Sequence, residues 1–147
     1  MSKENSQIKE NCKMSKKQVM AEIIRHTSLS DGIFDMTLKA EEIAKEAKAG
    51  QFISVYLNNK SKILPRPISI CGIDKEAGTL RIVYRTVGDG TKELSDYKEG
   101  EMVKILGPLG NGFTQKDKKA ILIGGGIGIP CLLYTSDAAD DSLRVDL

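Results

Sequence analysis

Large aromatic side chains are scarce in this sequence of 147 residues, which has no tryptophan, three phenylalanines and four tyrosines. A protein surface that binds single-stranded nucleic acid stacks bases on aromatic side chains interleaved with basic ones. The sequence lacks that pattern, and its net charge of +2 is too small to argue for nucleic acid. We therefore expect no nucleic-acid partner, and a small nucleic-acid-binding barrel is the alternative from a different functional class.

Cysteine, histidine and long apolar runs are also sparse. Cys12, Cys71 and Cys131 are too few and too scattered for a disulfide framework, and they lack the C-x₂-C spacing of a metal site. We expect no metal, with Cys71 a buried structural thiol and the single histidine, His26, in a surface or capping role. No apolar run approaches the roughly 20 residues that cross a bilayer, and the N-terminus has no signal-peptide core. The expected location is the cytoplasm, with no membrane contact.

The two ends of the sequence differ from its middle. Residues 1–16 are polar, lysine-rich and without period, which predicts a disordered leader. Residues 131–147 resemble a translated sequencing adapter, so we interpret them as a non-native tail on a truncated gene fragment and exclude them from the candidate site. The tail holds four aspartates and one arginine, so the rest of the chain carries a net charge of +5, which suits a polyanionic ligand such as a dinucleotide about as well as a nucleic acid.

Short β segments dominate residues 17–117. Their apolar residues alternate with polar ones, as in half-buried strands, and turns at Gly32 and Gly78 separate neighbouring segments. We predict strands over residues 18–24, 33–38, 52–57, 66–70, 79–86 and 102–106. Regularly spaced short strands favour a closed barrel, because closure removes exposed sheet edges. The predicted fold class is therefore mainly β, a six-stranded antiparallel Greek-key barrel with one short helix.

The glycine-rich loop over residues 88–91 interrupts the strand pattern. It leads into residues 92–97, for which we predict that helix, with Thr91 as its N-cap. Free N–H groups and the helix dipole favour an anion at such a helix start. Residues 41–47 have helical propensity but little room, so there we expect a turn or a single loop helix.

The apolar run over residues 119–124 does not alternate, which is typical of a parallel-sheet strand. It runs directly into Gly124, Gly126 and Gly128, small residues that let a pyrophosphate approach the backbone. The spacing does not match G-x-G-x-x-G, so a buried glycine-rich turn is the alternative. We expect residues 118–130 to be the first strand and glycine turn of a truncated α/β nucleotide-binding domain.

A candidate anion-binding strand begins at Arg66. Its guanidinium can bind phosphate oxygens bidentately, and Pro67 stiffens the strand that carries it. Ser69 points to the same face as Pro67 and can offer a hydroxyl to a flat heteroaromatic ligand. A strand arginine and serine carry little meaning alone, and their place in a longer series of motifs gives them weight.

The order of these motifs resembles that of a known family. Arg66-Pro-Ile-Ser69 is followed by Val83-Tyr-Arg85, the loop over residues 88–91, a glycine-rich segment over residues 107–113 and the glycine turn. From residue 18 to 130 this series resembles the ferredoxin-reductase-like flavoproteins, and within them the electron-transfer subunits of type B dihydroorotate dehydrogenase. The resemblance implies an FAD-binding barrel, then an NAD-binding domain and a cysteine-rich [2Fe-2S] segment, the last two largely missing here.

The resemblance also implies roles for individual residues. Arg66 would contact the FAD pyrophosphate, and Ser69 would lie near the isoalloxazine ring. The implied cofactor-binding residues are Arg66, Pro67, Ile68, Ser69, Val83, Tyr84, Arg85, Gly90 and Thr91, to which the glycine turn adds Gly124, Gly126 and Gly128. No catalytic side chain is implied, because the cofactors carry the redox chemistry.

The implied function is that of an oxidoreductase subunit in pyrimidine biosynthesis. Electrons from dihydroorotate, oxidised in a catalytic partner subunit of a heterotetramer, would pass through the [2Fe-2S] centre and FAD to NAD⁺. We expect this chain to bind FAD without completing the relay, because Cys131 alone cannot ligate a cluster. The close alternative is the α subunit of an NADPH-dependent ferredoxin oxidoreductase or sulfide dehydrogenase, which shares the barrel.

Overall fold

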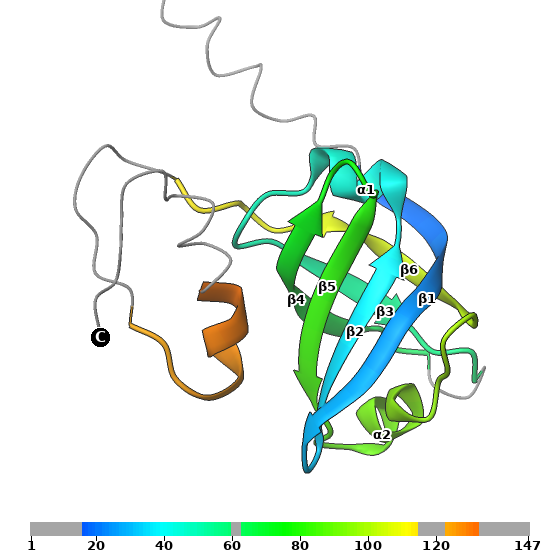
Figure 1. Cartoon of the computed structure of the whole chain (residues 1–147). Coiled ribbons are helices and arrows are strands. Elements are labelled where there is room, and N and C mark those ends of the chain that lie inside the picture. Colours follow the sequence, from blue (N-terminus) through cyan, green and yellow to red (C-terminus); the bar gives the residue numbers. More distant parts are fainter. Residues whose placement is uncertain (1–15, 60–62, 115–122, 133–147) are drawn as a thin grey trace, which may run out of the picture.

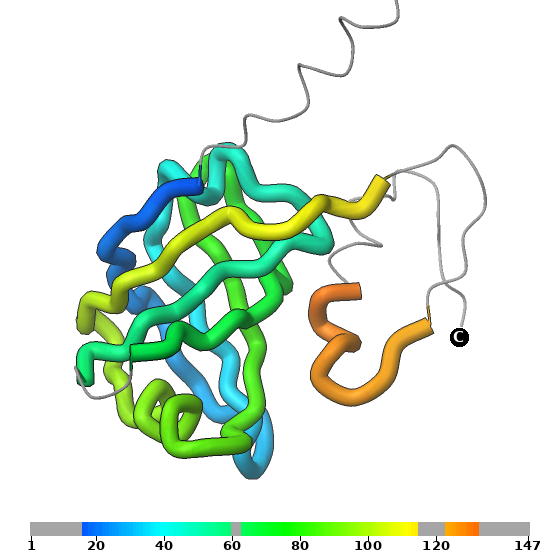
Figure 2. Tube along the Cα trace, turned by 180° about the vertical axis from the view of Figure 1, so that it is seen from behind, coloured from blue at the N-terminus to red at the C-terminus, as the bar shows by residue number. Residues whose placement is uncertain are grey.

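A computed structural model of the chain describes residues 16–59, 63–114 and 123–132. Its strands form a closed barrel in the order β1-β2-β5-β4-β3-β6, in which every neighbouring pair is antiparallel. Figure 1 shows α1 at one end of the barrel and α2 at the other, and Figure 2 shows the same barrel from behind. The predicted mainly β, antiparallel six-stranded barrel is confirmed.

The predicted strands are all present, and four of them are longer than expected, one by a single residue. The strands are β1 (Lys17–Ser30), β2 (Ile33–Lys39), β3 (Phe52–Tyr56), β4 (Arg66–Asp74), β5 (Thr79–Arg85) and β6 (Met102–Leu109). The helical elements are α1 (Glu41–Glu46), α2 (Asp89–Ser95) and the 3-10 turn η1 (Gly126–Gly128). Both β1 and β4 continue past a register shift, at Ile23/Arg25 and Ile70/Gly72. A β-bulge inserts one extra residue and shifts the alternation of apolar and polar residues. The sequence pattern therefore ends at the bulge, although the strand continues beyond it.

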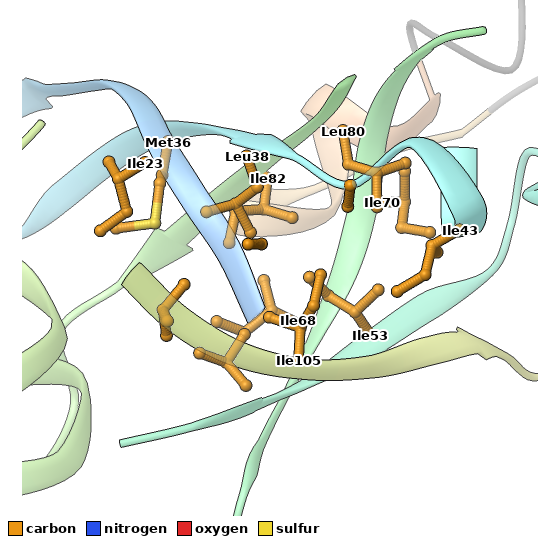
Figure 3. Packing of buried hydrophobic residues seen from close by; sticks show 14 of the residues in the cluster. Ile23, Met36, Leu38, Ile43, Ile53, Ile68, Ile70, Leu80, Ile82 and Ile105 are labelled. Atoms are coloured by element: carbon orange, nitrogen blue, oxygen red, sulfur yellow. The ribbon is translucent and has the colours of Figure 1, made fainter. Parts of the chain in front are cut away.

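Alternate aliphatic side chains fill the barrel interior. Met36 and Leu38 on β2 and Leu80 and Ile82 on β5 are all 0% exposed, and Figure 3 shows them among the other labelled core residues. Burying a side chain of this size stabilises the fold by about 1.5–3 kcal/mol. A register slip of one residue would move the whole set to solvent, so the core also fixes the pairing of the strands.

A chain of side-chain hydrogen bonds ties the segment after α2 to the barrel. His26 on β1 contacts the Tyr97 carbonyl oxygen through Nδ1 at 2.7 Å and the Tyr84 hydroxyl through Nε2 at 2.9 Å. Because a carbonyl oxygen only accepts, Nδ1 carries the ring proton and the Tyr84 hydroxyl donates to Nε2. Tyr97 follows α2 and Tyr84 lies on β5, so His26 joins three elements. The sequence predicts a surface or capping role for His26, whereas the structure shows a half-buried side chain that links these elements.

A buried carboxylate lies between two arginines on three neighbouring strands. Asp35 of β2 is 1% exposed. It accepts hydrogen bonds from Arg81 Nε at 3.0 and 3.1 Å and from Arg81 Nη2 at 2.9 Å, and Arg25 Nη2 lies 3.4 Å away. These bonds raise the pKa of the Arg81 guanidinium. The group joins β1, β2 and β5, although solvent reaches both arginine side chains and screens their charge.

Several expectations fall outside the described residues. They are the leader predicted over residues 1–16 except its last residue, most of the strand predicted over residues 119–124, and the tail predicted over residues 131–147 except its first two residues. Of this C-terminal part, the structure describes η1 and the helical turn that follows it, which lie beside β4 and β5 in Figure 1. No helix within the described ranges is long and apolar enough to span a bilayer.

The Asp35 ion pair generates a stability prediction. Asp35→Asn should lower the free energy of unfolding by about 1–3 kcal/mol, because charge-assisted hydrogen bonds to Arg81 are lost from a buried position. Urea denaturation followed by circular dichroism measures this change. Asp31→Asn removes the same charge from an exposed turn and should shift the free energy by less than about 0.5 kcal/mol. If both variants lost the same free energy of unfolding, the change in net charge would explain the effect and the ion pair would not.

Candidate functional site

An open pocket lies between the first residue of β4 and the first turn of α2. Its volume is about 460 Å³, and its lining residues are Arg66, Val87, Gly88, Asp89, Gly90 and Thr91. The strand supplies the arginine, the loop after β5 supplies Val87 and Gly88, and the first turn of α2 supplies the rest. Arg66 and the pair Gly90 and Thr91, which belong to separate sequence motifs, are therefore brought together in one pocket.

Gly90 allows Arg66 to lie against the helix. A Cβ atom at position 90 would collide with Nε, Nη2 and Cζ of the Arg66 guanidinium. From the other side, Arg66 Nη1 donates a hydrogen bond of 2.8 Å to the Leu64 carbonyl oxygen. That bond uses one of the five N–H donors of the guanidinium, and a bidentate contact to phosphate needs two. The arginine is thus held in a fixed direction and keeps enough donors for an anion.

The hydroxyl of Thr91 holds the loop before α2. Thr91 Oγ1 accepts hydrogen bonds from the N–H groups of Val87 at 2.9 Å and Gly88 at 3.2 Å, and it donates to the Gly88 carbonyl oxygen at 3.0 Å. Gly88 is the N-cap and α2 begins at Asp89, so Thr91 is the third helical residue. The prediction of Thr91 as N-cap is wrong, because a side chain at the third position can close the loop by reaching back. The N–H groups of Gly90 and Thr91 lie in the first turn, where no earlier turn provides acceptors.

Strand β4 changes partner half-way along its length. Residues 66–69 pair with β3, whereas residues 70–74 pair with β5 across the bulge at Ile70/Gly72. Residues 83–85 of β5 pair with β2. Within the described part of the chain, no ladder joins residues 66–69 to residues 83–85. We call the line between these two segments the seam.

Side chains along the seam alternate between the barrel interior and the outer face. Ile68 is 8% exposed and Tyr84 4% exposed, and both belong to the core. Pro67, Ser69 and Arg85 are exposed instead. Burial raises the pKa of the Tyr84 hydroxyl, which stays protonated and bound to His26. Of the residues predicted here, only the exposed ones present side chains to a ligand on the outer face, and Ile68 and Tyr84 present backbone.

The glycine turn lies on the outer face of β4 and β5 and not at the Arg66 pocket. η1 contacts β5, and Cys131 Sγ lies 2.8 Å from Cys71 Sγ. Cys71 and Val83 are buried, at 3% and 4% exposure, without belonging to the barrel core. The hydrogen bond to Cys131 and burial raise the pKa of the Cys71 thiol, while bonds from Cys71 and Ser69 lower that of Cys131 to about 7.

The predicted site residues therefore form two groups. Arg66, Gly90 and Thr91 line the pocket. The second group lies on the outer face of β4 and β5, and its members are Ser69, Val83, Gly126 and Gly128. Gly124 lies against Leu132 and Ile129 of the following helical turn, and Pro67, Ile68, Tyr84 and Arg85 lie along the seam. The seam runs from one group to the other.

Three pocket residues, Val87, Gly88 and Asp89, were not predicted as site residues. They flank Gly90 in the same glycine-rich loop, which is the only sequence signal that could have found them. A loop that wraps an anion uses consecutive backbone groups as well as the residues with recognisable side chains.

The sequence of this region matches a known family. The model for the oxidoreductase FAD-binding domain covers residues 19–113. The chain belongs to this family. The matched range runs from β1 through β6, so it includes the seam and the Arg66 pocket.

Curated relatives are electron-transfer subunits. The dihydroorotate dehydrogenase B (NAD(+)) electron transfer subunit of Listeria monocytogenes serotype 4a is 40% identical over 117 residues, covering 77% of this chain and 46% of the relative. The subunit with the same name from Streptococcus mutans serotype c is 44% identical over 115 residues, covering 76% of this chain and 44% of the relative. The chain spans less than half the length of these relatives.

Solved structures share the fold. The structure of an NADH-dependent reduced ferredoxin-NADP oxidoreductase is 30% identical, with a TM-score of 0.78 over 84% of this chain and 45% of that one. Phthalate dioxygenase reductase is 24% identical, with a TM-score of 0.66 over 86% of this chain and 41% of that one. The second likeness concerns the fold alone.

The contact between Arg66 and Gly90 can be tested with a single methyl group. Gly90→Ala should weaken FAD binding about tenfold or more, because the added Cβ displaces the guanidinium from the pocket. Titration of FAD followed by its fluorescence measures the affinity. Gly88→Ala is the matched comparison, since its Cβ would meet no atom within 4 Å, and it should cost less than about threefold. Equal losses would point to crowding of the loop in general.

Proposed function

We propose that the Arg66 pocket binds the diphosphate of FAD and that the seam receives the isoalloxazine ring. The single observation that carries this proposal is the convergence of the Arg66 guanidinium and the start of α2 on one cavity. A cation with a forked donor set and backbone N–H groups at a helix start are both suited to a diphosphate. The family to which the chain belongs binds FAD, which identifies the dinucleotide.

The residues present fit this cofactor. The pocket volume of about 460 Å³ lies in the range of ordinary ligand sites. The side chain missing at Gly90 leaves a cradle in which the guanidinium lies against the first turn of α2. A diphosphate would meet the Arg66 guanidinium on one side and the backbone N–H groups of the helix start on the other, while the Asp89 carboxylate, which also lines the pocket, lowers the positive potential there.

The seam suits the flavin ring. Ser69 follows Arg66 by three residues of extended chain, or about 10 Å, so a ring and a diphosphate of one ligand can occupy both places. Along the seam, residues 66–69 and 83–85 face each other without a shared ladder. Backbone N–H and C=O groups at such an edge can bind the polar edge of a flat heterocycle, as they would bind another strand. Ser69 adds a hydroxyl on the outer face, which bonds to Cys131 in this structure and would exchange that bond for one to the ring.

The chemistry of the bound cofactor is two-electron and one-electron transfer, and the chain's residues position it. Arg66 would offset one of the two negative charges of the diphosphate, Gly90 leaves room for the arginine, and Thr91 holds the loop before α2. The barrel wall behind the seam is aliphatic and dry, with Ile68 and Ile70 at 8% and 1% exposure. This wall excludes water from one face of the ring position.

We further propose that the chain supplies the FAD site of a dihydroorotate dehydrogenase electron-transfer subunit. Such a subunit would pass electrons from dihydroorotate, oxidised in a catalytic partner, to NAD⁺. The 40% and 44% identities to subunits of that name support this assignment over a ferredoxin-NADP oxidoreductase, at 30%. Sites for NAD⁺ and [2Fe-2S] would belong to parts of the relatives that this chain does not span.

The proposal predicts that removing the positive charge of Arg66 weakens FAD binding strongly. Arg66→Gln should weaken FAD binding by about 1.5–3 kcal/mol, because a charge-assisted hydrogen bond to the diphosphate is lost. Arg66→Lys should recover only part of the lost affinity, because an ammonium group keeps the charge but lacks the paired N–H donors of the guanidinium. Isothermal titration of the purified, flavin-stripped chain with FAD measures each affinity.

Arg25→Gln is the control for this experiment. It removes the same charge from β1, where the arginine lies near Asp35 and does not line the pocket. It should leave the FAD affinity within about twofold of the original. Unchanged affinity in Arg66→Gln, or equal losses in both variants, would overturn the diphosphate assignment.

A further inference from the structure

The ring position and the diphosphate pocket lie on different elements of the fold. The ring position borders residues 83–85 of β5, and the pocket includes the first turn of α2. Residues 86–88 connect these two elements, so the chain itself ties the start of α2 to β5. A helix held at one end only can tilt about that end, and tilting changes the direction in which its first N–H groups point.

His26 provides a second attachment, beyond the other end of α2. Its Nδ1 donates to the Tyr97 carbonyl oxygen at 2.7 Å, and its Nε2 accepts from the Tyr84 hydroxyl at 2.9 Å. Tyr84 is the middle residue of the β5 segment at the seam, and Tyr97 lies two residues beyond the end of α2. One imidazole therefore joins the strand of the ring position to the helix of the diphosphate pocket.

Further contacts hold the imidazole of His26. Its ring centroid lies 5.5 Å from that of Phe34 and 6.1 Å from that of Tyr84, and the Phe34 and Tyr84 rings stack at 5.7 Å. The backbone N–H of His26 donates to Glu99 Oε1 at 3.1 Å. Aromatic rings at these separations have preferred orientations. The packing therefore keeps both ring nitrogens directed at their hydrogen-bond partners.

The remaining contacts of this region do not tie it to β5. Leu94 of α2 is 0% exposed and belongs to the barrel core, but apolar burial is non-directional and does not set the tilt of a helix. The Asn58 N–H donates to the Tyr97 hydroxyl at 2.7 Å, which ties the same segment to the chain after β3. The link through His26 is directional at both of its ends and reaches the seam strand.

We propose that His26 is a positioning residue that holds the first turn of α2 at a fixed distance and angle from the ring position on β5. This inference rests on the proposed function. A ligand with two binding groups gains affinity when the spacing of its two sites matches its own, because binding at one site raises the effective concentration at the other. His26 does not line the pocket, so it acts on this gain through Tyr84 and Tyr97.

The test compares FAD, which fills both sites, with ADP and riboflavin, which each fill one. His26→Asn keeps an N–H donor near the position of Nδ1 and removes the acceptor for Tyr84. Its dissociation constant for FAD should rise about tenfold, whereas those for ADP and riboflavin should stay within about threefold of the original. Fluorescence titration of the flavin-stripped chain measures FAD and riboflavin, and competition with FAD measures ADP.

A second variant cuts the same link from the other side. Tyr84→Phe removes the hydroxyl and keeps the packed ring, so the link stays testable if His26→Asn fails to fold. Its dissociation constant for FAD should rise by a similar factor. The double variant should lose no more affinity than the larger single loss, because both changes remove one interaction. Tyr56→Phe is the matched control, since this half-buried tyrosine of β3 does not line the pocket. It should leave FAD affinity within about twofold of the original.

The outcomes separate a positioning role from a structural one. A structural role would lower the affinities for FAD, ADP and riboflavin together in His26→Asn, and that result would overturn the inference. Unchanged FAD affinity in both single variants, or additive losses in the double variant, would also overturn it. Failure of the unaltered chain to bind FAD would instead overturn the proposed function.

Discussion

The guanidinium of Arg66 occupies the space that a side chain at position 90 would need. With the guanidinium in this position, residue 90 of α2 has no room for a side chain, and the barrel holds the two elements close together. The barrel does so through its aliphatic core and the antiparallel pairing of its strands. The cavity depends on this close approach, while Thr91 holds the loop before α2 and the Leu64 carbonyl oxygen holds the arginine.

Each end of α2 is fixed by a different residue. At its start, Thr91 binds the backbone of Val87 and Gly88, and beyond its end His26 binds the Tyr97 carbonyl oxygen and the hydroxyl of Tyr84. Tyr84 is a core residue of β5, so the helix is anchored to the same strand that borders the seam. A short helix is marginal by itself, and these contacts explain why it keeps a defined place above Arg66.

The sequence predicts the strands well because their apolar residues alternate, and it misplaces their ends where β-bulges shift the alternation, as at Ile70/Gly72. It also brings Arg66 and Gly90 into one candidate site through the order of motifs. Side chains alternate along a strand, so Ile68 and Ser69 face opposite sides of β4. The sequence motif places both in the candidate site because they are adjacent in the sequence. The change of partner along β4 depends on contacts between distant segments, and no local pattern of residues encodes it.

The seam affects the stability of the barrel as well as ligand binding. Within the described residues, no backbone ladder joins residues 66–69 to residues 83–85. A ligand that contacts both segments would hold them together. Ligand binding would therefore raise the free energy of unfolding. At a free ligand concentration of 100 times the dissociation constant, this linkage is worth roughly 2.7 kcal/mol. A shortage of the ligand would then lower the free energy of unfolding of the chain.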